Sequence, residues 1–162
     1  MTLATHIVIA AALTKPIAAQ HPILAALVAI ASHYLSDAIP HWDYGVKSVL
    51  DNENLNTRRW STNRALLRRD MRRFAIDGFS GAAIVLLVVW PTTTTQWLWI
   101  ATAIIGGALP DFLQGVSLFL PFLRPHTRFH HFMHTKIKLG PYPLIGIPFQ
   151  IVITLVAIWF LC

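Results

Sequence analysis

Two imidazoles and two carboxylates follow a long apolar run in the segment "ASHYLSDAIPHWDY". His33 and Asp37 are four positions apart, a spacing that places both side chains on one face of a helix. Imidazole nitrogens and carboxylate oxygens bind divalent metals, and two ligands of one ion must share a face. Pro40 should end this helix, which leaves His41 and Asp43 in the loop that follows. The pattern predicts a metal site where an apolar helix meets water.

Further ionisable residues are expected at a similar depth on other helices. Counted at ~1.5 Å per residue from the cytoplasmic ends of the apolar runs, they lie within ~13 Å of those ends. A charged group at such a depth costs several kcal/mol unless it faces a partner, a cavity or an ion. We therefore expect a divalent metal to be bound by some or all of one set of residues, namely His6, His33, Asp37, Asp77, Asp111 and His130.

The segment "RPHTRFHHFMHTK" brings four more histidines to a loop that should face the same layer. The histidines would complete the ligands of the metal or protonate a leaving oxygen. Arg124 and Arg128 could hold a phosphate group, and they could equally serve only to set the topology. The residues that we expect to take part in catalysis are Asp37, His41, His131 and His134.

The composition limits the choice of metal. Cys162 is the one cysteine of the chain, which excludes disulfides within the chain and thiolate metal sites. Imidazole and carboxylate ligands suit Zn²⁺, with Mn²⁺ or Fe²⁺ as alternatives. We expect one or two such ions, with Zn²⁺ as the first choice.

The chain is too apolar for a typical soluble domain. Of its 162 residues 55% are hydrophobic and 12% are charged, whereas about a quarter are charged in soluble domains. Spanning the hydrocarbon core of a bilayer takes ~20 apolar residues. We expect an all-α polytopic bundle of four to five apolar helices that forms one domain over residues 1–162, with apolar runs at 2–14, 22–39, 74–90, 97–120 and 141–161. The first run is short, and no basic residue precedes it, so we expect a retained helix and not a signal peptide.

The basic residues are concentrated beside one apolar run. The net charge is +6, and seven arginines lie between Arg58 and Arg73. Leu67, Met71 and Phe74 are spaced to share one helical face, which predicts a basic interfacial helix over residues 61–73 before the chain turns into the bilayer. Such a segment suits anionic membrane lipids, and no nucleic acid is expected as a partner.

The distribution of charge also predicts the orientation. Basic loops face the cytoplasm, so residues 41–73, which include the polar loop 41–60, and residues 121–140 should be cytoplasmic. The uncharged turn "PTTTTQ" should lie outside. The N-terminus and the metal site then belong to the cytoplasmic side of a multi-pass protein.

Several candidates have a purely structural alternative. Asp77 could stabilise the start of a helix through its dipole, and Asp111 could cap a helix that restarts after a kink. His6 could be a core histidine bonded to the backbone. His126 and His131 could bind phosphate or be simple interfacial residues.

The segments "THIVIAAAL" and "GGALPDF" and the late histidines resemble the predicted metal-dependent hydrolases of the bacterial inner membrane, of the YdjM type. The segment "SHYLSDAIPHWDY" is similar to a His-x-x-x-Asp-x-x-Pro-His segment of related small membrane proteins. The resemblance implies a role in metal binding for His6, Asp111 and one histidine of residues 126–134. Two departures are Phe112 and Leu113, where that family has an acidic residue and a histidine, and a late cluster without its glycine.

A looser similarity links the His-x-x-x-Asp pattern to zinc-dependent phospholipases C, which hold several metals. Together these patterns favour a hydrolase that acts on a phosphoester, in a phospholipid or lipid-linked phosphate, by metal-assisted attack of water. A carrier or channel for metal ions or protons is the main alternative, because intramembrane carboxylates and histidines also mark transport paths. A non-catalytic module that binds lipid or a partner protein is the third.

Overall fold

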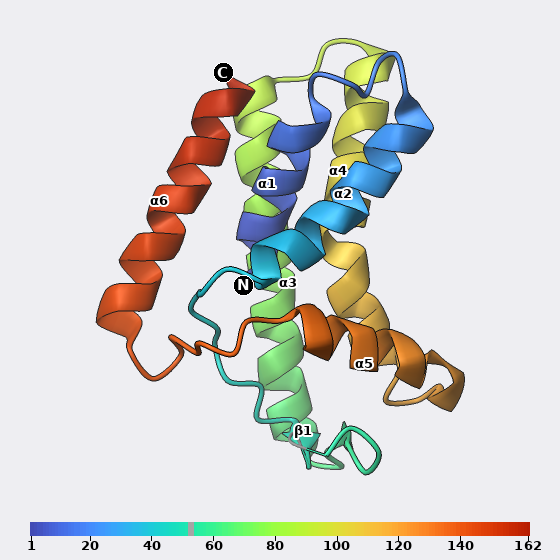
Figure 1. The fold of residues 1–162 in the computed structure, drawn as a ribbon, viewed down its shortest axis with the longest axis vertical. Helices are drawn as coiled ribbons and strands as arrows, with labels where there is room; N and C mark the ends of the chain where they lie inside the picture. The colour runs from blue at the N-terminus through green and yellow to red at the C-terminus, as the bar shows by residue number, and fades with distance from the viewer. Residues whose placement is uncertain (52–53) are drawn as a thin grey trace.

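The computed structural model describes residues 1–51 and 54–162 as a bundle of helices (Figure 1). The predicted all-α class is confirmed. Residues 52 and 53 of the predicted polar loop lie outside the described residues. The elements are α1 (Leu3–Thr14), α2 (Pro22–Asp37), β1 (Val49–Leu50), β2 (Arg59–Trp60), α3 (Arg64–Val89), α4 (Thr94–Val116), the 3-10 turn η1 (Pro121–Leu123), α5 (Arg124–Met133) and α6 (Pro143–Leu161). The two short strands pair antiparallel in a small hairpin within the predicted loop.

The prediction of four to five membrane-spanning helices was too high. Among the described residues, α4 and α6 are long and apolar enough to cross a membrane. The apolar helices α1 and α2 have 12 and 16 residues. At ~1.5 Å per residue both are shorter than the ~30 Å hydrocarbon core. They run up and down in the upper half of Figure 1, and α2 ends near mid-height.

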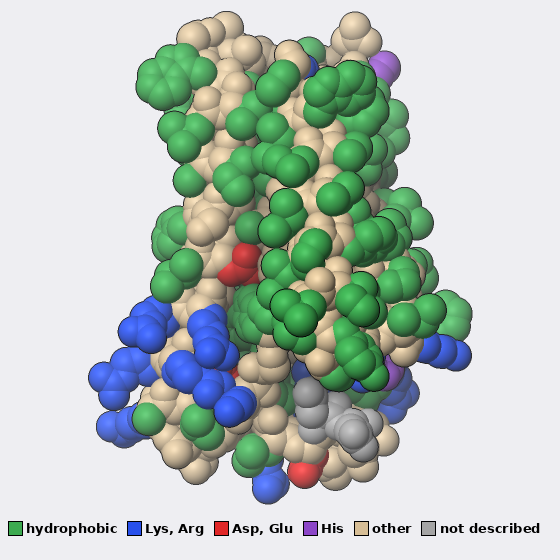
Figure 2. Space-filling model, turned by 90° about the vertical axis from the view of Figure 1, so that its left-hand side faces the viewer, with side chains coloured by type: hydrophobic (Ala, Val, Ile, Leu, Met, Phe, Trp, Pro, Cys, Tyr) green, Lys and Arg blue, Asp and Glu red, His purple; other side chains and the backbone are tan. Residues whose placement is uncertain are grey.

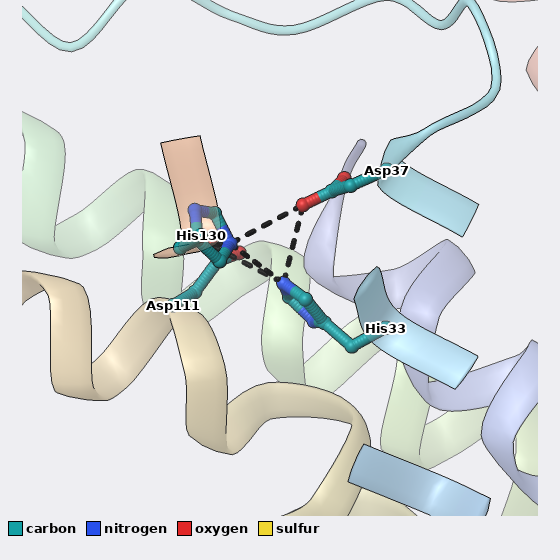
Figure 3. A group of neighbouring side chains, drawn as sticks. All are labelled: His33, Asp37, Asp111 and His130. Carbon is teal, nitrogen blue, oxygen red and sulfur yellow. Dashed lines mark hydrogen bonds and ion pairs between the residues drawn. The ribbon is translucent and has the colours of Figure 1, made fainter. Parts of the chain in front are cut away.

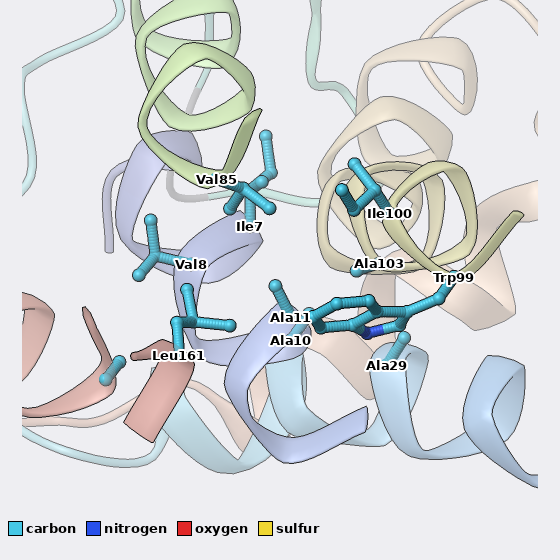
Figure 4. Close-up of a cluster of buried hydrophobic side chains, with 11 residues drawn as sticks. Ile7, Val8, Ala10, Ala11, Ala29, Val85, Trp99, Ile100, Ala103 and Leu161 are labelled. Atoms are coloured by element: carbon cyan, nitrogen blue, oxygen red, sulfur yellow. The ribbon is translucent and has the colours of Figure 1, made fainter. Parts of the chain in front are cut away.

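The helix α1 lies at the centre of the bundle and contacts α2, α3, α4 and α6. A helix that is apolar on all sides is expected in a core, and most of α1 is buried. Figure 4 shows Ile7, Val8, Ala10 and Ala11 of α1 among side chains from the surrounding helices. The core also contains a polar contact, because the indole of Trp99 donates to Thr14 Oγ1 at 2.9 Å.

The predicted interfacial helix and the apolar run after it form one continuous helix. α3 starts after Asn63, whose side chain accepts from the backbone N–H groups of Ala65 and Leu66, and it continues for 26 residues. No turn separates its basic first part from its apolar second part. The predicted change of direction near residue 73 was therefore wrong, since nothing in "RRFAIDGF" breaks a helix.

The surface divides along the length of the bundle. In Figure 2, hydrophobic side chains cover most of the visible face, and Lys and Arg side chains gather at its lower end. Large apolar residues are exposed on several helices, for example Ile23, Phe79 and Leu144. Extended exposed apolar surface indicates contact with a membrane or a partner. Together with α4 and α6, it supports association with a membrane.

Two backbone contacts bring the segment after α5 to the end of α2. The N–H of Thr135 donates to the carbonyl oxygen of Asp37 at 2.8 Å. His41 and Lys138 pair as an isolated parallel bridge. These contacts place the histidines of α5 against the loop that follows α2.

Candidate metal centre

Four side chains from three helices converge at the C-terminal end of α2 (Figure 3). α2 supplies His33 and Asp37, α4 supplies Asp111 and α5 supplies His130. Nε2 of His33 lies 3.1 Å from Nε2 of His130 and 3.3 Å from Oδ2 of Asp37. Nε2 of His130 lies 3.3 Å from Oδ2 of Asp37 and 3.4 Å from Oδ1 of Asp111. We call these four residues the inner group.

The spacing of these donor atoms suits a small divalent cation. Ligand atoms 2.0–2.2 Å from a tetrahedral zinc ion lie about 3.3–3.6 Å from one another. The longest of the measured separations, 3.6 Å, joins Nε2 of His33 to Oδ1 of Asp111. A proton could join only one pair of these donor atoms at a time, whereas a single metal cation could be bound by all four of them. The inner group could therefore hold a metal ion.

Backbone contacts fix the orientation of His33. Its Nδ1 lies 2.8 Å from the carbonyl oxygen of Gly107, which can only accept, so Nδ1 carries the proton. In the neutral ring, Nε2 then presents its lone pair to Asp37 and Asp111. Histidines that bind metals usually donate their other ring nitrogen to a carbonyl or carboxylate in this way. His33 is also fully buried, so its ring has no contact with bulk water.

His6 stacks on His33, with ring centroids 3.8 Å apart. Ser36 donates its hydroxyl to the carbonyl oxygen of His33, so Nδ1 of His6 donates to Ser36 Oγ at 2.9 Å. Nε2 of His6 lies 3.1 Å from Oδ1 of Asp37 and has no hydrogen-bond partner. His6 therefore faces the other oxygen of the shared carboxylate.

A second group of potential ligands lies on that side of Asp37. It consists of Asp37, His41 and His134, and we call it the outer group. Nε2 of His41 lies 3.7 Å from Oδ1 of Asp37. Asp43 is adjacent, with Oδ2 3.1 Å from Nε2 of His41 and 3.4 Å from Nε2 of His134. The amino nitrogen of Met1 lies between the two carboxylates, 2.9 Å from Asp37 and 2.8 Å from Asp43.

The charges around the two groups favour cations. Burial alone would lower the pKa of His130, but Asp111 and Asp37 raise it above its usual value. Partial burial would raise the pKa of Asp43, but His134 and His41 hold it well below its usual range. Asp43 is thus an anion at neutral pH, and the carboxylates draw either a proton or a metal ion to the histidines.

Besides His6, two of the predicted site residues lie outside both groups. Asp77 accepts hydrogen bonds from the backbone N–H groups of Leu3 at 2.8 Å and Ala4 at 3.1 Å, so it caps the start of α1. The hydroxyl of Tyr44 also donates to it. His131 is exposed on α5. Partial burial and the positive charge of Lys138 lower the pKa of His131.

The other candidates of the late segment have separate contacts. His126 Nε2 lies 2.9 Å from the hydroxyl of Tyr34. Arg128 donates to the side-chain oxygen of Asn56, and Arg124 is exposed at the start of α5. Asp111 lies inside α4, one position after Pro110, so it does not cap a restarted helix.

Three contributors to the site had no assigned role in the predicted site. The first is Gly107, whose carbonyl oxygen orients His33. The pair of glycines in "GGALPD" indicates close helix packing, but it does not indicate a contact with a histidine. Asp43 was expected as a loop residue, although its spacing from His41 could have suggested a shared ligand. The third is the amino group of Met1, which is part of the backbone, so no sequence motif could have predicted its contacts with the two carboxylates.

Comparisons with protein-family models, curated proteins and solved structures found no match. The function is therefore inferred from the geometry of the inner and outer groups and from the apolar surface around them.

Proposed function

We propose that this protein is a membrane-embedded, metal-dependent hydrolase that cleaves a phosphoester in a phospholipid or lipid-linked phosphate. The observation that carries the proposal is a convergence of side chains from α2, α4 and α5, in which two imidazole nitrogens lie 3.1 Å from each other and 3.3–3.6 Å from an oxygen of each of two carboxylates. With both imidazoles neutral, the two carboxylates leave negative charge in the inner group, which the amino group of Met1, 2.9 Å from Asp37, offsets only in part. A divalent ion would offset it, and Zn²⁺ is our first choice, with Mn²⁺ or Fe²⁺ as alternatives.

The inner group has the ligand chemistry that hydrolysis requires. A divalent ion lowers the pKa of a bound water toward about 7 and offsets the charge on phosphate oxygens. The side chain of Asp111 is 32% exposed, whereas those of His33, Asp37 and His130 are nearly inaccessible. Water would therefore approach beside Asp111. With a single ion at the inner group, His134, with 24% exposure, would be free to give a proton to the leaving oxygen.

Two features support a lipid phosphate as substrate. An apolar groove on the surface between α1, α3 and α6 is lined by Trp42, which lies between His41 and Asp43 in the sequence. It would take an acyl chain while the phosphate reached the metal. Arg58 lies near His131, whose pKa it helps to lower, and its buried Nε has no hydrogen-bond partner. Arg58 could thus bind a phosphate oxygen.

We further propose a multi-pass arrangement in the bacterial inner membrane with the metal centre toward the cytoplasm. α4 and α6 would cross the bilayer, and the apolar second part of α3 would lie in it between the cytoplasmic hairpin and the outer turn before α4. α1 and α2 would occupy the outer half of the bilayer. The basic part of α3, the hairpin and α5 lie at one end of the bundle, as the positive-inside rule requires of cytoplasmic segments (Figure 1).

The test of the function uses purified protein in lipid nanodiscs, with metal content measured by elemental analysis. Asp37→Asn is nearly isosteric but removes charge, so it should lose the metal and all hydrolysis of a panel of phospholipids and lipid phosphates. Asp70→Asn is the control, because Asp70 is a buried carboxylate on α3 outside both groups. Full metal content and unchanged turnover in Asp37→Asn would overturn the assignment.

The orientation is tested by cysteine labelling in cells. Exposed Cys162 is first replaced by serine, because it would react with the same reagent. A cysteine at Thr94 should then be labelled from outside and a cysteine at exposed Thr62 only after the membrane is permeabilised. The opposite pattern would place the metal centre on the outer side.

A further inference from the structure

We infer that the carboxylate of Asp37 bridges two metal positions, the second of which is formed by the outer group. This inference rests on the proposed metal at the inner group and adds a second ion beside it. The two oxygens of Asp37 face different histidines. Oδ2 lies 3.3 Å from both His33 and His130, whereas Oδ1 lies 3.1 Å from His6 and 3.7 Å from His41.

His41 is oriented as a ligand of the outer position. Nδ1 of His41 donates to the carbonyl oxygen of Ile39 at 2.6 Å, so Nε2 of the neutral ring points its lone pair at Asp37 and Asp43. The ring of His41 is buried, with 2% exposure. This repeats the arrangement of His33 with the carbonyl of Gly107. A lone pair directed at a carboxylate oxygen is unfavourable unless a proton or a cation lies between them.

His6 is a second, independent observation. It is completely buried, and its Nε2 has no hydrogen-bond partner although it lies 3.1 Å from Oδ1 of Asp37. Because Nδ1 carries the ring proton toward Ser36, the unpartnered Nε2 is an acceptor that faces an acceptor. A cation on the Oδ1 side of Asp37 would resolve this contact as well.

Both positions are open to water on one side. At the inner position the side chain of Asp111 is 32% exposed, while those of His33, Asp37 and His130 are at most 3% exposed. At the outer position the side chain of His134 is 24% exposed, and that of neighbouring Asp43 is 43% exposed. Metal sites with an open position bind water or substrate there. A phosphate could therefore contact both ions. Two-metal hydrolases hold the attacking and leaving oxygens between such paired ions.

The amino group of Met1 is the rival cation at the outer position, because it contacts Oδ1 of both Asp37 and Asp43. A bound metal would replace it or share the carboxylates with it. If the amino group occupies the outer position, each chain binds one ion, and if a metal occupies it, each chain binds two.

The experiment measures Mn²⁺ and Zn²⁺ per chain after metal removal and reloading of the full-length protein in nanodiscs. The wild type should bind two ions, and His41→Ala and His134→Ala should each bind one. His131→Ala is the matched control, since His131 is exposed on the same segment and belongs to neither group. It should still bind two ions. Asp111→Asn should weaken the inner ion and leave the outer ligands intact.

The wild type also gives a readout that needs no variant. Two Mn²⁺ ions joined by one carboxylate are magnetically coupled, so a doubly loaded sample should show a spin-coupled electron paramagnetic resonance spectrum. One ion per wild-type chain, lost in Asp111→Asn, would overturn the second position and leave the proposed function standing. Two ions that persist in both His41→Ala and His134→Ala would also overturn it. A wild type that binds no ion would remove both proposals.

Discussion

Nδ1 of His33 and the carbonyl oxygen of Gly107 lie 2.8 Å apart and join α2 to α4 beside the inner group. The same glycine lets α1 approach α4, since a Cβ added at Gly107 would lie 3.0 Å from the carbonyl oxygen of His6. One residue thus sets the spacing of three helices and the tautomer of a potential ligand. Helix packing and the chemistry of the candidate site are consequently linked at this position.

The three neighbouring histidines of α5 should differ sharply in their effect on metal binding. Loss of a residue that orients a ligand typically costs 10- to 100-fold in metal affinity, and loss of the ligand itself should cost at least as much. His130→Ala should therefore weaken binding at the inner group by about 10-fold or more. His126→Ala, which loses only a contact with Tyr34, and His131→Ala should leave it within about threefold. Titration with Zn²⁺ against a competing chelator measures this, and equal losses in all three variants would contradict the geometry.

Asp77 should matter for stability and not for metal binding. Asp77→Asn keeps one acceptor oxygen for the start of α1 but loses the negative charge that stabilises a helix N-terminus. The free energy of unfolding should fall by about 1 kcal/mol. We expect a lower Tm in detergent and an unchanged metal content. Tyr44→Phe removes only the hydroxyl that donates to Asp77 and should have a smaller effect. Loss of metal from folded Asp77→Asn would place this carboxylate in the site after all.

Two glycines one turn apart on α3 should respond oppositely to alanine. A Cβ at Gly81 would lie 2.6 Å from Cα of Ala4, so α1 and α3 would have to separate. Overpacking of this kind costs roughly 1–3 kcal/mol, and the Tm of Gly81→Ala should fall. At Gly78 the nearest atom, on Leu3, is 3.8 Å away. Gly78→Ala should keep or raise the Tm, because alanine favours a helix by about 0.8–1 kcal/mol. Similar melting of both variants would argue against close contact between α1 and α3.

Asp70 should make stability depend on pH. Burial would raise its pKa, but the guanidinium of Arg69 and the backbone N–H of Ser48 lower it below the usual value. A carboxyl with a lowered folded pKa stabilises the protein above its unfolded pKa of about 3.9 and loses this contribution as pH falls through the folded pKa. The Tm difference between wild type and Asp70→Asn should thus be largest near neutral pH and shrink below about pH 4. A difference that stays constant over this range would exclude a charged Asp70 as its source.

Spacing and depth in the sequence were enough to anticipate much of the inner group. The i, i+4 pair His33 and Asp37 lies on one face of α2, and Asp111 lies at a comparable depth on α4. Depth along a helix does not give rotation about its axis, however. Asp77 has a suitable depth but faces the start of α1, and His131 is turned about 100° from His130 by the helical repeat.

The number and lengths of the helices were harder to predict than their positions. Hydropathy marks an apolar run, but it does not distinguish a bilayer span from a helix buried by its neighbours. α1 is apolar because other helices surround it. The turn predicted near Phe74 is absent for a different reason. The chain changes there from basic to apolar residues, but such a change does not require the helix to change direction.

α1 is synthesised well before α6, yet the two helices are in contact. The hydroxyls of Thr5 and Thr154 lie 3.1 Å apart, and Gln150 donates to Thr2. His33 and His130 are separated by 97 residues, which take roughly 5–20 s to translate at 5–20 residues per second. During this interval Asp37 has no α5 beside it. Loading of the proposed metal would therefore follow the synthesis of α5, and a nascent chain that stops before α5 carries an incomplete set of potential ligands.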